Sequence, residues 1–435
     1  MRYTLHMGKT LTFLHAADLH LGAPFRGLRA LSKTWAQRLL TAIPEAYERV
    51  IDAALSRRVD FVVISGDIFD GVHPSYGDYR KFFAGLERLN QAGIPVYLCT
   101  GNHDPYTSWA DDLFALPDNT VMLPASKPGY VLFRRNGQPL CLVAGRGFYS
   151  QAWPVDEDVS EGISRAAAER ALASDDPDAA QAPFCVGVMH TGFDLDLQKA
   201  PVEPAKLLGR GVDYWALGHL HKKLAYPSWD DPCAVFSGCI QGRDIKETGE
   251  RGCFVVTLEQ DAPTRLEFVP TASVAWEKID VDVSACATVS EIPDLIMRAL
   301  FRANGKAHCE EMCVRVTLTG ATHLHDVLAR PGVLEDVRSQ INEGYPAFFC
   351  DALIDATRRP LDKGALMNAG LFPAVLMKTA RAQRANVADE AAYLQEEFLQ
   401  KGIALPAACV REIDALADQA ENLVLDLLQG GEVRQ

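Results

Sequence analysis

The sequence has little positive charge for its length. It holds 43 Lys and Arg against 57 Asp and Glu, which gives a formal net charge of −14. This balance argues against a general nucleic-acid coat protein, which would be basic. It does not exclude a nuclease, because a bound metal ion brings its own positive charge and basic loops can lie on an acidic body.

Long hydrophobic runs and a disulfide framework are absent as well. No stretch approaches the ~20 apolar residues of a membrane-spanning helix, and residues 1–10 lack the apolar segment of a signal peptide. The 11 Cys follow no framework spacing, and two of them, Cys99 and Cys185, lie in apolar runs. This pattern is typical of Cys that serve as small core residues in a reducing compartment. We therefore expect a cytoplasmic protein with no signal peptide and no contact with a membrane.

The composition is that of an ordinary globular protein. Hydrophobic residues make up 48% of the 435 and charged residues 23%, which is enough for a large core and for two or three domains. Short apolar runs at 61–65 and 95–99 predict buried strands, and the helical spacing of apolar residues predicts helices at 35–58 and 79–92. Strand-like and helix-like segments continue to about residue 258 and predict an α/β fold with a multi-stranded core.

The pattern changes near residue 275. Polar and apolar residues alternate over 276–283, as in a half-exposed strand, and 291–303 has helical spacing. We predict three parts: a large α/β domain at 1–274, a small α+β domain at 275–360 and a helical region at 361–435. The last helix, at 412–428, carries an apolar stripe. The stripe packs onto the chain's own domains or docks a partner, and the sequence leaves both interpretations open.

Five short polar motifs each follow a predicted strand. They are Asp18-Leu19-His20, Gly66-Asp67-Ile68-Phe69-Asp70, Gly101-Asn102-His103-Asp104, the single residue His190, and Gly218-His219-Leu220-His221. Ligands of open α/β sheets bind at the carboxyl ends of the strands. Taken singly, each motif is ordinary: a Gly-Asp pair forms turns, and a lone His after a strand is more often a core residue. Five motifs in this order, which hold five of the 11 His, are not explained by ordinary turns.

The residue types in these motifs suit a pair of divalent metal ions. Carboxylate, imidazole and amide groups without a thiolate favour Mn, Fe or Zn over Mg or Ca alone. Two ions roughly 3.5–4 Å apart would contact both the attacking and the leaving oxygen of a phosphoryl group. One carboxylate must bridge such ions, and Asp67 is the natural candidate. We expect the glycines before Asp67, Asn102 and His219 to let the backbone turn sharply off each strand.

The motifs resemble those of the calcineurin-like metallophosphoesterase superfamily. Segments 15–22 and 66–70 resemble the SbcD-type DNA repair nucleases, and segments 216–222 and 238–249 are similar to the YhaO branch of these exonucleases. The resemblance covers roughly the first 270 residues. It implies an α/β-β/α sandwich as the metallophosphoesterase domain, a small α+β capping domain and a helical C-terminal region.

The resemblance also implies roles for the motif residues. One metal ion would be held by Asp18, His20, Asp67 and His221, and the other by Asp67, Asn102, His190 and His219. The two divalent ions would be Mn²⁺, with Fe²⁺ or Zn²⁺ as alternatives. A metal-bound hydroxide would attack phosphorus. His103 would ligate neither ion; it would stabilise the transition state or protonate the leaving oxygen.

Asp70 departs from the pattern of the archaeal and eukaryotic relatives, which carry His three residues after the bridging Asp. In the related protein phosphatases an Asp at this spacing pairs with the catalytic His. We therefore expect Asp70 to orient His103 and to support its protonated form. His73 could supply the missing imidazole, but a solvent-exposed loop His is the preferred interpretation.

Predictions about substrate and partners rest on softer signals. Arg26, Lys222 and Arg243 lie near the motifs in sequence and could contact DNA phosphates, although a surface or core role fits each at least as well. Aromatic residues near the motifs could stack on an unpaired base, although a surface or core role fits each equally well; they are Tyr106, Trp109, Phe148 and Tyr149. The resemblance implies DNA as substrate, a homodimer, and a coiled-coil ATPase of the SbcC type as a partner that binds residues after about 375.

The leading hypothesis is a metal-dependent DNA exonuclease or endonuclease of DNA repair. The first alternative is a calcineurin-like phosphodiesterase for a small molecule such as a nucleotide or lipid headgroup. The extra domains and the similarity after His221 disfavour it. The second alternative is a DNA-end-binding scaffold without catalysis, which the complete ligand set disfavours.

Overall fold

The computed structural model describes residues 9–24, 32–109, 113, 115–154, 157–305, 309–368, 372–384, 387–400 and 413–428. Contacts divide the chain into two compact units. The first comprises 1–278, 301–314 and 347–351, and the second comprises 279–300, 315–346 and 352–435. No helix among the described residues is long and apolar enough to cross a membrane.

Two six-stranded sheets form the first unit. The first sheet has the order β12-β11-β1-β2-β3-β4 and the second the order β5-β6-β7-β8-β10-β9. The first contains β1 (Thr10–Ala16), β2 (Phe61–Ser65), β3 (Val96–Cys99), β4 (Thr120–Met122), β11 (Gly252–Glu259) and β12 (Arg265–Pro270). The second contains β5 (Gly129–Arg135), β6 (Gln138–Arg146), β7 (Phe184–His190), β8 (Tyr214–Gly218), β9 (Leu224–Pro227) and β10 (Pro232–Phe236). Strands β1 to β4 are parallel, and so are β6, β7, β8 and β10; antiparallel strands flank both groups.

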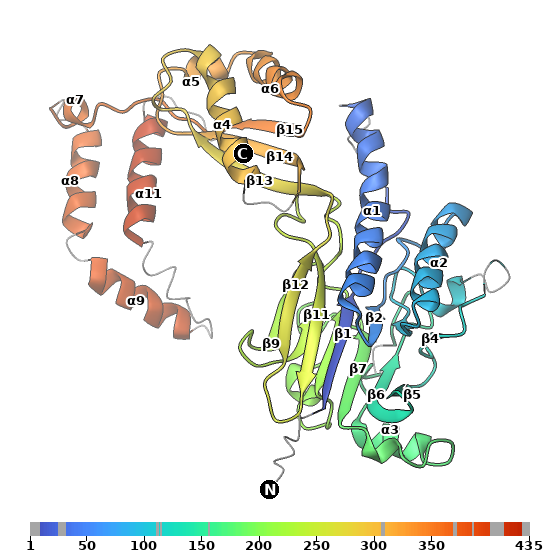
Figure 1. Cartoon of the computed structure of the whole chain (residues 1–435). Helices are drawn as coiled ribbons and strands as arrows, with labels where there is room; N and C mark the ends of the chain where they lie inside the picture. The colour runs from blue at the N-terminus through green and yellow to red at the C-terminus, as the bar shows by residue number, and fades with distance from the viewer. Residues whose placement is uncertain are drawn as a thin grey trace, which may run out of the picture. The chain divides into compact units, whose positions relative to one another are not determined.

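The two sheets share one apolar layer. Phe13 stacks on Phe61 within the first sheet, with ring centroids 5.0 Å apart, and Tyr214 of the second sheet meets Phe13 edge-on at 5.4 Å. Helices α1 (Lys33–Arg57) and α2 (Tyr76–Gln91) cover the other face of the first sheet (Figure 1). Helix α3 (Arg165–Leu172) and long loops cover the second sheet. The predicted α/β sandwich is confirmed.

Local capping explains where the predicted helices begin. Helix α2 starts three residues before the predicted Tyr79 because Ser75 and Asp78 form a reciprocal capping box. Ser32 caps α1 by accepting a hydrogen bond from the Trp35 amide at 3.2 Å, and Arg58 ends that helix in the left-handed conformation.

A third sheet and several helices follow in sequence. The sheet has the order β13-β14-β15, formed by Val274–Asp282, Glu311–Thr319 and Phe348–Asp355. The predicted strand at 276–283 is β13, and the predicted helix at 291–303 is α4 (Ile292–Asn304). Helices α5 (His325–Leu328) and α6 (Val333–Gly344) complete the segment. The division into 1–274, 275–360 and 361–435 remains a prediction.

The C-terminal region is helical as predicted. Its described helices are α7 (Lys363–Asn368), α8 (Phe372–Arg384), α9 (Val387–Gln400) and α11 (Ile413–Leu428). Helices α8 and α11 contact each other, and both carry a fully buried side chain, Met377 and Leu425 respectively. The stripe residues Leu423 and Leu427 of α11 are exposed. The described part of the stripe therefore lies on the face of α11 that does not carry Leu425.

Candidate metal centre

All five motifs lie at the carboxyl ends of parallel strands. Asp18 and His20 follow β1, Asp67 follows β2, and Asn102 and His103 follow β3 in the first sheet. His190 is the last residue of β7, and His219 directly follows β8 in the second sheet. Because the two sheets pack face to face, these strand ends meet in one place.

The backbone at this edge is strained. Asp18, His20, Asp67 and His219 have positive φ angles of 51°, 48°, 50° and 105°. Side-chain-bearing residues rarely adopt this conformation, and each costs of order 1–3 kcal/mol. Such residues persist where the surrounding structure fixes them, and they cluster at functional sites.

The glycines of the motifs serve two different purposes. Gly66 has φ +82° and turns the backbone off β2, as expected. Gly101 and Gly218 instead allow close approach: a Cβ on Gly101 would lie 2.1 Å from the Asp67 carboxylate, and one on Gly218 would lie 1.8 Å from the Ser65 carbonyl. At these two positions the close contact, rather than a left-handed backbone, is what requires Gly.

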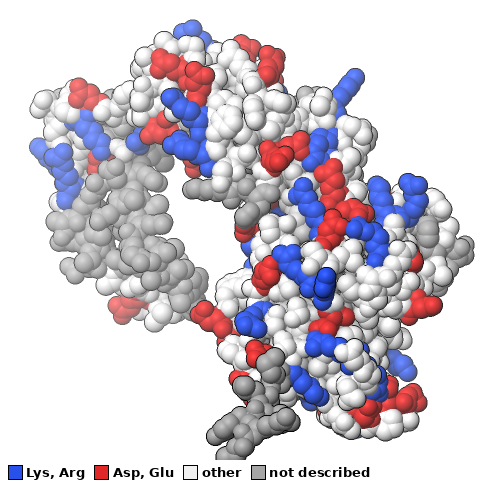
Figure 2. All heavy atoms as spheres, in the orientation of Figure 1, with Lys and Arg blue, Asp and Glu red and all other residues white. Residues whose placement is uncertain are grey.

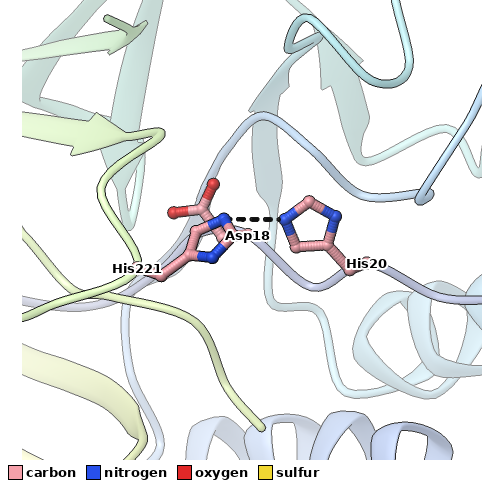
Figure 3. A group of neighbouring side chains, drawn as sticks. All are labelled: Asp18, His20 and His221. Carbon is pink, nitrogen blue, oxygen red and sulfur yellow. Dashed lines mark hydrogen bonds between the residues drawn. The ribbon is translucent and has the colours of Figure 1, made fainter. Parts of the chain in front are cut away.

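One ligand cluster consists of Asp18, His20 and His221. The Nε2 atoms of His20 and His221 face each other at 3.0 Å, beside the Asp18 carboxylate (Figure 3). That carboxylate accepts hydrogen bonds from the His219 amide at 3.0 and 3.1 Å. Asp18 and His20 are almost completely buried.

A second cluster consists of Asp67, His190 and His219. Nε2 of His190 lies 3.4 Å from Oδ2 of Asp67 and 3.2 Å from Oδ1 of Asn102. The same Asp67 oxygen lies 3.9 Å from Nε2 of His20, which belongs to the first cluster. Asp67 therefore lies between the two clusters.

The contact that one ring nitrogen of a His makes determines which of its nitrogens is available to a metal ion. Nδ1 of His190 donates to the Ser65 carbonyl at 2.9 Å, so Nε2 carries the lone pair when the ring is neutral. Nδ1 of His221 is hydrogen-bonded to Glu247 at 2.6 Å, whereas Nδ1 of His20 lies 3.0 Å from Asp70 without hydrogen-bond geometry among the described residues. The buried donor set and this orientation of the imidazoles fit divalent metal ions.

His219 has the opposite orientation. Its Nε2 lies 3.1 Å from the carboxylate of Asp196, which leaves Nδ1 as the nitrogen with an available lone pair. Burial lowers the pKa of His219 to about 4 and that of His20 to about 4, so both imidazoles are neutral, as ligation requires.

The centre holds a buried negative charge. Burial would raise the pKa of Asp67, but His190, His20 and His103 outweigh it and hold the pKa below its ordinary value. Burial would lower the pKa of His190, but Asp67 outweighs it and raises the pKa to about 9. A positive charge, on His190 or on a bound cation, is therefore needed beside Asp67 at neutral pH.

His103 is the exposed member of the group. Its backbone N–H donates to Asp67 at 2.9 Å, and its ring is 42% exposed. Its Nδ1 donates to the backbone carbonyl of Asp70 at 3.0 Å, whereas the Asp70 carboxylate is 4.0 Å from Nδ1. That carboxylate lies closer to His20, at 3.0 Å, and to Arg243, at 2.8 Å. Asp70 thus contacts His103 mainly through its backbone carbonyl, and its carboxylate lies at the outer limit of an ion pair.

The predicted phosphate-binding residues lie in different settings. Arg26 falls outside the described residues. Lys222 is exposed and follows His221 directly. Arg243 is half-buried, and its guanidinium is bound to Asp70 and Glu247. His73 is exposed, as expected.

The four aromatic residues also separate into two kinds. Phe148 is buried with its ring edge-on to His190, and the partly buried Trp109 packs against the core and donates to the Asp104 carbonyl at 3.0 Å. Tyr106 and Tyr149 are 45% and 57% exposed, and their rings are nearly parallel with centroids 6.3 Å apart. The core interpretation therefore holds for Phe148 and Trp109.

Sequence reasoning assigned no role to three acidic residues around the centre. Asp104 is buried and accepts hydrogen bonds from the amides of Ile68 and Gly101, and burial raises its pKa to about 8. Glu247 lies in the segment that resembles the YhaO branch, which was its one signal. Burial would raise the pKa of Glu247, but His221 and Arg243 outweigh it and hold the pKa well below its usual range. Asp196 lies in a loop with no motif.

Comparisons with known proteins agree with this geometry. Residues 11–223 match the calcineurin-like phosphoesterase family, and residues 276–358 match the middle domain of metallophosphoesterase YhaO. An uncharacterised metallophosphoesterase YhaO of Bacillus subtilis (strain 168) is 29% identical over 337 residues, which cover 77% of this chain and 78% of that protein.

Two further relatives are named for DNA repair or nuclease function. The DNA double-strand break repair protein Mre11 of Aeropyrum pernix is 28% identical over 62% of this chain and 63% of its own length. A component of the nuclease SbcCD of Escherichia coli (strain K12) is 30% identical over 30% of each chain. Residues 11–223 therefore form a calcineurin-like phosphoesterase domain, and the matches and the ligand clusters together show a metal-dependent hydrolase.

Proposed function

We propose that this protein is a two-metal phosphodiesterase that cleaves DNA, as an exonuclease or endonuclease of DNA repair. The observation that carries the proposal is the position of Asp67 between two ligand clusters, beside the exposed His103. Two cations that share one carboxylate suit the in-line displacement at a phosphoryl group.

The two ions would have four ligands each. Asp18, His20, Asp67 and His221 would hold one, and Asp67, Asn102, His190 and His219 the other. When bound, the ions would supply an activated water and neutralise charge on the phosphate. The mixture of carboxylate, amide and imidazole ligands favours Mn²⁺, with Fe²⁺ or Zn²⁺ as alternatives.

His103 would act on the substrate directly. Because its Nδ1 donates to the Asp70 carbonyl, Nε2 is the nitrogen that remains for the substrate. A protonated Nε2 would donate to a phosphate oxygen in the transition state or to the leaving oxygen. The hydrogen bond from the His103 amide to Asp67 keeps this ring beside the ligand clusters.

The site and the relatives support DNA as substrate; the charge of the chain does not. The names of the Mre11 and SbcCD relatives carry DNA repair and nuclease function. The exposed rings of Tyr106 and Tyr149 could stack on an unpaired base, and the exposed Lys222 could contact a phosphate. On the face drawn in Figure 2, basic side chains lie among acidic ones rather than in one broad patch.

The remaining proposals concern partners and location. The exposed residues Leu423 and Leu427 of α11 support docking of a coiled-coil ATPase of the SbcC type on the region after about residue 375. A homodimer, a cytoplasmic location and a capping role for residues 275–360 complete the proposal.

A small-molecule phosphodiesterase is the second candidate. The net charge of −14 and the mixed charges in Figure 2 favour it, since neither offers a long basic path for a polyanion.

One assay separates these functions. The full chain with Mn²⁺ is given end-labelled duplex DNA, single-stranded DNA and a generic aryl phosphodiester, beside a His103→Ala variant. DNA cleavage that is lost in the variant supports the proposal. Turnover of the aryl ester without DNA cleavage favours the small-molecule function, and DNA binding without any hydrolysis favours a scaffold.

A further inference from the structure

Arg243 lies between two carboxylates near the metal centre. Its Nη1 donates to Oδ1 of Asp70 at 2.8 Å, and its Nη2 donates to Oε1 of Glu247 at 3.1 Å. Its backbone N–H donates to the second oxygen of Glu247 at 2.7 Å. One guanidinium thus joins two acidic side chains that are 177 positions apart in the sequence.

Each of these carboxylates also contacts one imidazole, Glu247 by a hydrogen bond and Asp70 at ion-pair distance. Oδ1 of Asp70 lies 3.0 Å from Nδ1 of His20, and Oε1 of Glu247 lies 2.6 Å from Nδ1 of His221. The opposite nitrogens of the two rings, both Nε2, are the pair that face each other at 3.0 Å in Figure 3. Asp70 and Glu247, joined by Arg243, therefore contact the Nδ1 atoms of both imidazoles of the first cluster.

We propose that Asp70, Arg243 and Glu247 form a clamp that positions His20 and His221 for metal binding. This inference rests on the proposed function, because it takes both His as ligands. It makes Arg243 a positioning residue, in contrast to the phosphate-binding role suggested by the sequence.

The proton on His221 is consistent with the clamp. Nη2 of Arg243 lies 3.1 Å from Nδ1 of His221, and two N–H groups cannot bond to each other. Glu247 is closer to the same nitrogen, at 2.6 Å, and it is a pure acceptor when ionised. Nδ1 therefore carries the hydrogen, Glu247 accepts it, and Nε2 keeps its lone pair for the metal ion.

The clamp is shielded from solvent. The side chains of Asp70, Arg243 and Glu247 are 23%, 21% and 13% exposed. Removal of one partner from a shielded ion pair leaves an uncompensated charge. Without Arg243, the two carboxylates would lose their common cation, and the imidazoles would lose their fixed orientation.

The geometry requires Arg rather than Lys. A planar guanidinium presents several N–H groups in a rigid fork and can bind two carboxylates at once. An ammonium is a compact point charge on a flexible stem and cannot reproduce both contacts. Arg243→Lys should therefore restore only part of the function that Arg243→Gln removes.

The test measures Mn²⁺ affinity of the full chain by calorimetry, independently of any substrate. Loss of such outer contacts typically lowers metal affinity about 10- to 100-fold. We expect this loss in Arg243→Gln and Glu247→Gln, and a smaller loss in Arg243→Lys. Because Arg243→Lys keeps the positive charge, it also tests the proposal if Arg243→Gln fails to fold. The control is Lys246→Gln, which removes one exposed positive charge from the same loop and should leave Mn²⁺ affinity unchanged.

A substrate-binding Arg243 would give the opposite split. The KM for DNA would rise in Arg243→Lys and Arg243→Gln while Mn²⁺ affinity stayed within about twofold of the unaltered chain, and that result overturns the clamp. A chain that binds Mn²⁺ without cleaving DNA contradicts the proposed function but still allows the affinity comparison. A chain that binds no Mn²⁺ overturns both.

Discussion

The sequence predicted the metal-ligand residues much better than it predicted the residues that contact those ligands. The ligands sit at strand ends, so the order of parallel strands brings them together. The residues behind them, such as Arg243 and Asp196, come from loops, and their contacts depend on side-chain direction. Strand topology thus places the ligand residues together, whereas loop side chains contact and orient these ligands.

The largest effect is expected from the residue shared by both clusters. Asp67→Asn would remove the buried charge between them. We expect it to raise the activation free energy of DNA hydrolysis by several kcal/mol and so to lower the rate at least about 10³-fold. Initial rates at saturating Mn²⁺ measure it. Asp52→Asn on the exposed surface of α1 is the control, and equal activity of the two variants would break the distinction between ligands and surroundings.

His103 should affect the reaction without affecting the metal ions. Replacement by Ala would lower kcat about 10²- to 10³-fold, because a positioned proton donor is lost, while Mn²⁺ affinity stays unchanged. Single-turnover rates and calorimetry on the same sample measure the two effects. A parallel loss of metal affinity would move His103 into the ligand set.

Asp196 gives a weaker version of the clamp. It holds one imidazole at 3.1 Å and its side chain is 41% exposed, so Asp196→Asn should lower Mn²⁺ affinity only about 10-fold. Asp194→Asn removes the same charge from the same loop at an exposed position and serves as control. If both variants lose affinity equally, the effect belongs to net charge rather than to the contact with His219.

A buried His that is not a ligand should affect stability rather than metal binding or catalysis. His15 is fully buried, with Nδ1 2.9 Å from the Tyr214 hydroxyl and Nε2 3.3 Å from that of Ser65, and burial lowers its pKa to about 3. Below pH ~6.5 the unfolded chain takes up a proton that the folded chain does not. The free energy of unfolding should therefore fall as the pH drops from about 6.5 towards 3, by at most about 1.4 kcal/mol per pH unit.

Urea unfolding of the metal-free chain between pH 5 and 8 measures this slope. The His15→Gln variant should show a shallower dependence on pH than the unaltered chain. Identical slopes would mean that His15 does not contribute.

The pattern of the sequence predicted an α/β fold, because buried strands such as 61–65 are plain apolar runs, and the resemblance implied the sandwich. It also predicted which residues gather, since parallel strands fix where their ends lie. It did not predict that Asp70 faces His20 and Arg243 rather than His103. Two imidazoles lie within reach of that carboxylate, and the guanidinium that draws it away is 173 residues distant.

The glycines show the same limit. A Gly at a strand end is compatible with a turn or with a close contact, and the sequence does not distinguish the two. Only the three-dimensional structure reveals that a Cβ at Gly101 would strike Asp67. The partner of the α11 stripe depends likewise on packing that no pattern in one chain specifies.

The most direct test of the account is DNA hydrolysis during stepwise loading with Mn²⁺. The metal-free full chain receives zero, one and two equivalents of Mn²⁺, and cleavage of end-labelled DNA is measured at each step. The account predicts little activity at one equivalent and full activity only when the second is bound. Full cleavage at one equivalent, or cleavage that persists in the presence of a chelator, would contradict it.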